Sequence, residues 1–278
     1  MTGAMPHPAQ LPPQTFVVLA ALAVVGLAST TLFPRPAPAA GRAAPIHPAP
    51  VEPPARPAPA ELPARPAPAP SPQAKKRPSG YLIVRARVDH DLVVRSAPGG
   101  PVVARLGRRT EFGSPLTVSV VRKHGRWLGV VTTALPNGRL GWVDSRSRLR
   151  VSTTRLSLVL DLSARRLLLR DGGRVLRRMS VGVGRSSSPT PAGRFAVTDR
   201  LRGGAYGPYY GCCILALSAH QPNLPAGWRG GDRIAIHGTN DPSSIGAATS
   251  AGCPHARDAD LRVLMRRIPL GTPVIIRH

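Results

Sequence analysis

Two residues in the last quarter of the chain carry the side chains best suited to nucleophilic chemistry. His237 follows the apolar run 234–236, and Cys253 ends the string Ser250-x-Gly252-Cys253. A cysteine attacks a carbonyl efficiently only as its thiolate, so it needs a base nearby. Imidazole can accept the thiol proton, hold the resulting ion pair, and later protonate a leaving amine. The two side chains therefore indicate a cysteine–histidine centre for acyl transfer.

The glycine before the cysteine adds a second ingredient of that chemistry. Without a side chain, Gly252 lets the backbone approach a substrate carbonyl closely. The N–H groups of Gly252 and Cys253 would then face the oxyanion that develops during attack. On these residues alone the alternative remains open that Cys253 is buried and His237 is structural.

The other two cysteines do not form a disulfide framework. Cys212 and Cys213 are adjacent, and adjacent cysteines are not expected to pair easily without backbone strain. Cys253 is therefore the candidate free thiol. A zinc site built from this pair with His220 and His255 lacks the usual spacing between cysteine ligands, so we expect no metal and no cofactor.

Several short elements must position these residues within the segment 155–278. Apolar residues alternate over 156–162, which predicts a half-buried strand. The runs 166–170 and 174–178 flank an Asp-Gly-Gly turn and predict a hairpin. Only 258–267 has convincing helical periodicity, with acidic residues near its N-terminal end. The segment is therefore expected to be mainly β with one late helix.

A different pattern occupies residues 80–150, where short Val- and Leu-rich runs alternate with Gly, Pro and Asn turn signals. This pattern predicts a small β-barrel. The pieces around Trp127 and Trp142 resemble a bacterial SH3-like domain, a family whose members often bind cell-wall peptides. Packing inside the barrel is an equally good role for both tryptophans. The runs are 81–88, 92–95, 102–106, 116–122, 127–132 and 140–143.

The sequence of the N-terminal segment predicts that the protein is exported. Residues 1–33 include an uncharged apolar stretch at 15–33, long enough for a membrane anchor or a signal-peptide core. One feature opposes export, because Arg35 and Arg42 follow the stretch and no cation precedes it. Residues 34–79 contain 16 prolines and 13 alanines, which favour an extended linker without a packed core. A secreted or membrane-anchored protein associated with the cell wall is the expectation.

The excess of positively charged residues indicates which classes of partner the protein is expected to bind. The chain has 38 Lys and Arg against 13 Asp and Glu, a net charge of +25. Such a field favours polyanions such as anionic lipid, an anionic cell wall or nucleic acid. No nucleic-acid-binding module is evident, so nucleic acid is not expected as a partner.

The sequence motifs around the histidine and the cysteine resemble those of the L,D-transpeptidase catalytic family, which is also called YkuD-like. The resemblance covers residues 155–278. It is carried by His237-Gly238-Thr239, Ser250-x-Gly252-Cys253, the late helix and Gly271-Thr272-Pro273-Val274. Further segments occur in the family's usual order, namely Leu158-Val159-Leu160-Asp161, Asp171-Gly172-Gly173, Thr190-Pro191-Ala192-Gly193 and Gly207-Pro208-Tyr209.

The resemblance implies a β-sandwich-like domain and a defined reaction. Cys253 would attack the bond before the terminal D-alanine of a peptidoglycan stem tetrapeptide, and His237 would be the acid/base. D-Alanine would leave, and an amine from a second stem would resolve the thioester. The Gly238 carbonyl would orient the imidazole, Gly252 would supply an oxyanion donor, and Ser250 would brace the loop.

The chain departs from the family directly after the cysteine. Where the family has an apolar residue followed by Arg or Asn, this chain has Pro254 and His255, with Arg257 further on. His255 or Arg257 would bind a substrate carboxylate or be a solvated surface group. Tyr209 would line a lid over the site or pack in the core. Two alternatives to transfer also stay open, a non-catalytic peptidoglycan-binding scaffold and an L,D-carboxypeptidase-type hydrolase.

Overall fold

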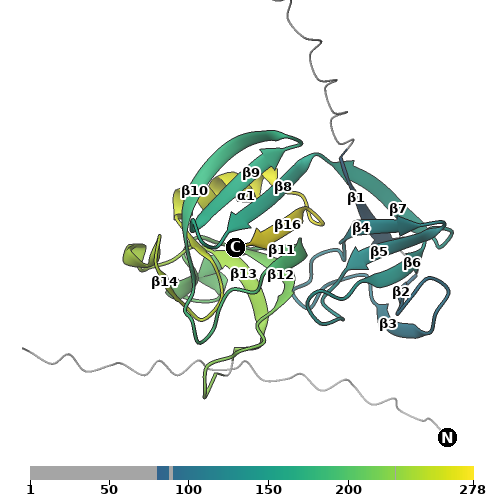
Figure 1. Cartoon of the computed structure of the whole chain (residues 1–278), viewed down its shortest axis with the longest axis horizontal. Coiled ribbons are helices and arrows are strands. Elements are labelled where there is room, and N and C mark those ends of the chain that lie inside the picture. Colours follow the sequence, from purple (N-terminus) through teal and green to yellow (C-terminus); the bar gives the residue numbers. More distant parts are fainter. Residues whose placement is uncertain (1–79, 88–89, 229) are drawn as a thin grey trace, which may run out of the picture. The chain divides into compact units, whose positions relative to one another are not determined.

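A computed structural model describes residues 80–87, 90–228 and 230–278 (Figure 1). The segments 1–33 and 34–79, predicted to be an anchor or signal and a linker, lie outside the described residues. No helix within the described ranges is long and apolar enough to cross a membrane. The described chain forms two β sheets and one α-helix, which confirms the predicted fold class, mainly β with a helix late in the sequence.

The first sheet has seven strands in the order β3-β2-β6-β5-β4-β1-β7, and all of its pairings are antiparallel. Val84, Val94, Val130 and Val143 are fully buried in its core. The resemblance of this region to an SH3-like domain stays a prediction. The strands are β1 (Tyr81–Ala86), β2 (Leu92–Arg95), β3 (Val102–Leu106), β4 (Val118–His124), β5 (Trp127–Val131), β6 (Gly141–Asp144) and β7 (Leu149–Thr154).

The second sheet has nine strands in the order β14-β10-β15-β13-β12-β11-β16-β8-β9, and β9 also pairs with β10. That last pairing closes eight of the strands into a ring around an apolar core. The strands are β8 (Leu156–Asp161), β9 (Arg166–Asp171), β10 (Arg174–Gly184), β11 (Gly193–Arg202), β12 (Cys213–His220), β13 (Arg233–His237), β14 (Ala248–Ser250), β15 (His255–Ala256) and β16 (Pro273–Arg277).

Strand β10 allows the ring to close because it is long and changes partners along its length. Its first part, 174–180, pairs with β9, whereas Val181 and Gly182 pair with β15. Gly182 is needed at this change, since a Cβ there would lie 2.3 Å from the backbone oxygen of Ser244. The strand thereby connects the hairpin that begins this sheet to the segment that carries the cysteine.

The single α-helix, α1 (Asp258–Arg267), has the bounds predicted from the sequence. It buries Leu261 and Leu264 in the core of the second sheet. Asp260, in its first turn, forms an ion pair of 2.6 Å with Arg177 of β10. Three short 3-10 helices complete the elements, η1 (Gly203–Ala205), η2 (Pro208–Tyr210) and η3 (Pro242–Ser244).

Loops of the first sheet contact the second sheet through polar groups. The side-chain amide of Asn137 donates to the His220 carbonyl at 2.6 Å and accepts from the His220 N–H at 2.9 Å. The loop before β4 adds a hydrogen bond from Thr110 to Asp199 and an ion pair between Glu111 and Arg233. These contacts tie the first sheet to β11, β12 and β13.

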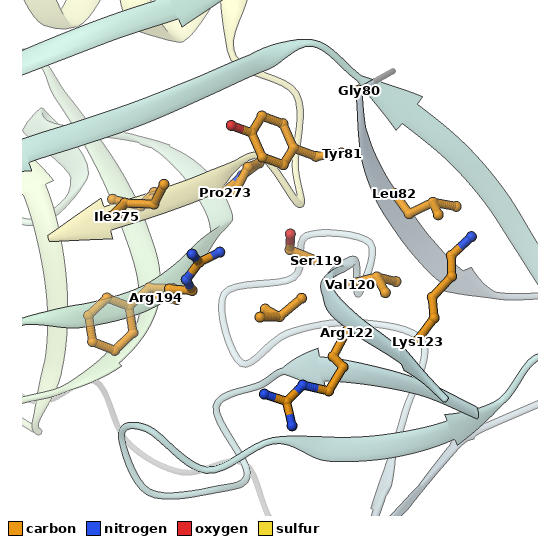
Figure 2. Close-up of a pocket in the computed structure, with 13 residues that line it drawn as sticks. Gly80, Tyr81, Leu82, Ser119, Val120, Arg122, Lys123, Arg194, Pro273 and Ile275 are labelled. Carbon is orange, nitrogen blue, oxygen red and sulfur yellow. The ribbon is translucent and has the colours of Figure 1, made fainter. Parts of the chain in front are cut away.

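A cleft of about 270 Å³ lies where β1 and β4 face β11 and β16 (Figure 2). Three cationic side chains, Arg122, Lys123 and Arg194, are among the residues that line it. Its lining includes neither His237 nor Cys253, so this cleft is separate from the predicted acyl-transfer centre.

Candidate active site

His237 is the last residue of β13, and its ring is held in one orientation. The side chain is only 1% exposed. Its Nδ1 lies 2.6 Å from the Gly238 carbonyl, which can only accept, so the proton is on Nδ1. Nε2 is buried and has no hydrogen-bond partner in the described part of the chain. The ring therefore presents Nε2 as an unoccupied base.

The surroundings of His237 favour its neutral form. Burial, followed by the neighbouring His255 ring, lowers the pKa of His237 to about 3, while the Gly238 carbonyl opposes the shift. The His255 ring centroid lies 4.7 Å away. At neutral pH the imidazole is uncharged and able to accept a proton.

Cys253 is the free cysteine of the described chain, and the residue is partly buried. Its Sγ accepts a hydrogen bond from the Ala235 N–H at 3.4 Å and lies 3.9 Å from the Arg233 carbonyl. Because Arg233, Ala235 and His237 alternate along β13, their side chains share one face of the strand. The thiol thus lies beside the strand that carries the histidine, although no hydrogen bond joins Sγ to Nε2 within the described residues.

The thiol is uncharged in this arrangement. Burial raises the pKa of Cys253 to about 11, against the opposing effect of the Ala235 N–H. With His237 also neutral, the resting pair is a thiol and an imidazole. The ion pair considered from the sequence is therefore not the resting state of the described site.

The loop before the cysteine is held by hydrogen bonds on both sides of Gly252. Its φ of 121° suits glycine, and a Cβ there would lie 1.9 Å from Gln221 Nε2. The Gly252 N–H donates to Ser250 Oγ at 3.1 Å, and Thr190 Oγ1 donates to the Gly252 carbonyl at 2.7 Å. Ser250 thus occupies a bracing position. Since the Gly252 N–H donates to Ser250, its predicted oxyanion role does not fit this geometry, which leaves the Cys253 N–H as the other donor predicted for that role.

Gln221 is a site residue that the sequence did not indicate. Its amide nitrogen donates to the carbonyls of Pro189 and Ala251, each at 3.0 Å. The side chain is buried and fixes the loop that leads to Cys253. A lone glutamine far from the motif in sequence offers no pattern that reveals this role.

His255 lies inside the site and is not a solvated surface group, whereas its predicted role in binding a substrate carboxylate stays a prediction. It is 4% exposed, with Nδ1 3.0 Å from Ser244 Oγ and Nε2 3.2 Å from the Tyr209 hydroxyl. Burial lowers its pKa, and the carboxylate of Asp241 opposes this. It pairs with His237 in register because β13 and β15 run parallel there. The ring is thus enclosed between Ser244 and Tyr209 and not solvated.

Tyr209 covers the two histidines without being buried. The centroid of its ring lies 5.4 Å from that of His237 and 5.6 Å from that of His255. The residue is nevertheless 42% exposed, so core packing was the wrong alternative. Burial of its hydroxyl, followed by the nearby Cys253, raises the pKa of Tyr209 to about 12. Arg257 is not brought to the rings; it is the exposed N-cap residue of α1.

Cys212 and Cys213 form a disulfide, which corrects the expectation that they stay unpaired. They lie where η2 gives way to β12, after Gly211 with a φ of 56°, so the backbone is not in regular strand conformation before the pair. The Cys213 carbonyl accepts from the Gly238 N–H at 3.0 Å, and Asp258 Oδ1 accepts from the Cys212 N–H at 3.0 Å. This turn therefore fixes the peptide that orients His237.

The raised thiol pKa predicts slow alkylation of the free protein. At pH 7 a thiol with a pKa of about 11 has a thiolate fraction on the order of 10⁻⁴. We expect the rate of iodoacetamide modification of Cys253 to rise about tenfold per pH unit from pH 6 to 10, measured by intact mass. A rate that is fast and independent of pH near neutrality would contradict the neutral resting pair.

The strands of the second sheet lie in a segment that is similar to a known family of catalytic domains. Residues 155–276 match the YkuD model of the L,D-transpeptidase catalytic domain. The chain is 33% identical over 123 residues to YkuD of Bacillus subtilis, which is named as an L,D-transpeptidase; the match covers 44% of this chain and 65% of that protein.

Two further proteins to which the chain is similar are also named L,D-transpeptidases. YqjB of Bacillus subtilis, also named as an L,D-transpeptidase, is 36% identical over 104 residues, 35% of this chain and 57% of YqjB. The chain thus spans less than two thirds of both Bacillus relatives. A solved L,D-transpeptidase from Mycobacterium smegmatis is 17% identical with a TM-score of 0.39, covering 72% of this chain and 100% of that one. Residues 155–276 are thus similar in sequence to the L,D-transpeptidase catalytic domain of the YkuD family.

Proposed function

We propose that this protein is an L,D-transpeptidase that acts on peptidoglycan stem peptides, with Cys253 as nucleophile and His237 as general acid and base. One observation carries the proposal. The partly buried Cys253 contacts the strand whose last residue presents an imidazole with Nδ1 fixed and with Nε2 lacking a hydrogen-bond partner among the described residues. A nucleophile next to an oriented base is the arrangement that covalent acyl transfer requires.

Acylation begins with rotation of the Cys253 side chain away from the backbone of β13 and toward His237. Nε2 takes the thiol proton as Sγ attacks the carbonyl before the terminal D-alanine of a stem tetrapeptide. The Cys253 N–H stabilises the oxyanion of the tetrahedral intermediate. Collapse of the intermediate breaks the C–N bond, Nε2 returns its proton to the leaving amine, and a thioester remains on Sγ.

The second half of the reaction reuses the same base. An amine of a second stem attacks the thioester, and His237 Nε2 accepts the proton that this amine loses. The C–S bond breaks, a new amide links the two stems, and the proton returns to the thiol of Cys253. We further propose that the protein acts outside the cytoplasm at the cell wall, as expected if 1–33 is an anchor or signal and 34–79 a linker.

Intact mass spectrometry of the full chain with a defined tetrapeptide tests the proposal. We expect an adduct whose mass equals the donor minus D-alanine, together with free D-alanine. Adding an amine acceptor should discharge the adduct to a cross-linked peptide. A folded protein that forms no adduct would contradict the proposal and favour a non-catalytic scaffold. Discharge by water at the same rate with and without the amine would instead indicate an L,D-carboxypeptidase-type hydrolase.

A further inference from the structure

A loop of the first sheet, residues 109–114, is anchored against the second sheet beside the candidate site. Thr110 Oγ1 donates to Asp199, which is fully buried in β11. The next residue, Glu111, forms an ion pair with Arg233 of β13, whose side chain is only 13% exposed. Two consecutive residues of the loop are thus fixed on partners that the second sheet encloses.

Phe112 follows these two anchors and extends the apolar surface around the nucleophile. The Arg233 guanidinium lies 5.8 Å from its ring centroid, and the Tyr206 ring packs against it edge-on at 6.2 Å. Phe112 belongs to the same apolar cluster as Tyr210 and Cys253. A residue of the first sheet therefore helps to form the surroundings of the thiol.

Four aromatic residues, Phe112, Tyr206, Tyr210 and Tyr209, form a continuous row that we call the aromatic strip. Tyr206 and Tyr210 are 6.3 Å apart, and Tyr210 and Tyr209 are 5.3 Å apart, each measured between ring centroids. The strip ends at His237, whose ring lies 4.9 Å from Tyr210. Tyr206 and Tyr209 are 41% and 42% exposed. Large aromatic rings left open beside a nucleophile are suited to binding a partly apolar chain.

We propose that the aromatic strip binds the donor stem peptide, and that Phe112 is a specificity-determining residue supplied by the first sheet. The inference rests on the proposed function, and it commits to the donor because Cys253 belongs to the cluster that Phe112 extends. A peptide whose carbonyl reaches Sγ must lie across this cluster. Its alanine methyl groups and aliphatic stem then pack on the partly buried ring of Phe112 and on the exposed side chain of Tyr206.

Equilibrium binding separates this inference from turnover. The full chain carrying Cys253→Ala is titrated calorimetrically with the tetrapeptide, with and without Phe112→Ala. We expect Phe112→Ala to raise the Kd about tenfold, the effect of losing one aromatic contact together with its apolar area. Tyr81→Ala serves as the matched control, because this aromatic residue of the first sheet lines the cleft that is separate from the acyl-transfer centre, and it should leave the Kd unchanged.

Further variants keep the test decisive. If Phe112→Ala does not fold, Tyr206→Ala replaces it, since that side chain is exposed, and the same rise in Kd is expected. The thermal unfolding midpoint of each variant is measured beside the titration, so that a change in Kd is taken only from folded protein. An unchanged Kd in a folded variant, or no tetrapeptide binding at all, overturns the inference. Absence of the wild-type adduct, by contrast, counts against the proposed function alone.

Discussion

Replacing Cys253 by alanine abolishes the acyl-enzyme: we expect no adduct with the tetrapeptide and a fall in D-alanine release of at least about 10⁴-fold. In the proposed mechanism the thioester forms on Sγ, and no other free thiol exists in the described chain. Removing the nucleophile of a covalent mechanism leaves only the rate enhancement from binding and the oxyanion donor. Intact mass and a coupled assay for D-alanine measure both effects.

The chain offers a matched control for this variant. A Cys212→Ser/Cys213→Ser protein also loses sulfur atoms near the site, but its backbone can still hold Gly238 through the Cys213 carbonyl. It should keep the adduct, and peptide mapping should place that adduct on Cys253. An adduct that survives Cys253→Ala in a folded protein would show that another group is the nucleophile.

The helix and most strands could be predicted because their signals are local. Residues 258–267 combine an apolar stripe, acidic residues in the first turn and Pro269 beyond the end, and the helix has those bounds. Strand β7 was missed because Leu149–Thr154 is largely exposed and has no apolar alternation; it is a strand because it pairs with β1. Strand β8 was expected to be half-buried, but Ser157 and Val159 are also buried.

The candidate site was predicted in part. The motif around Cys253 and His237 gave the pair, and the structure places both on or beside β13. The contacts that decide what each group can do come from residues distant in sequence. Thr190 and Gln221 set the loop before the cysteine, and no local pattern reveals such partners.

The position of Phe112 is another feature that the sequence alone does not predict, because it depends on contacts between the two sheets. Its loop contacts β13 only because Thr110 and Glu111 find buried partners more than eighty residues away in sequence. Each of those partners, Asp199 and Arg233, is an ordinary charged residue in a strand when read from the sequence. Packing between sheets depends on which side chains the folded strands present, and spacing along the chain does not encode it.

The structure also explains why the resting thiol is not already charged. A permanent thiolate would need a stabilised imidazolium, whereas burial and the adjacent His255 keep the His237 ring neutral. Proton transfer must therefore accompany attack on the carbonyl, when the oxyanion donor lowers the energy of the developing charge. This assigns His237 a role in the reaction step and none in charging the free thiol.

That distinction makes His237→Asn the second decisive variant. Asparagine can keep a hydrogen bond to the Gly238 carbonyl through Nδ2 but has no equivalent of Nε2. We expect acylation by the tetrapeptide to fall by about 10²- to 10⁴-fold, the range for loss of a general base. Iodoacetamide modification of Cys253 at pH 9 should stay within about threefold of wild type, because the resting thiol does not depend on the ring. A parallel fall in both rates would mean that His237 already ionises the thiol in the free protein, and the neutral-pair mechanism would be wrong.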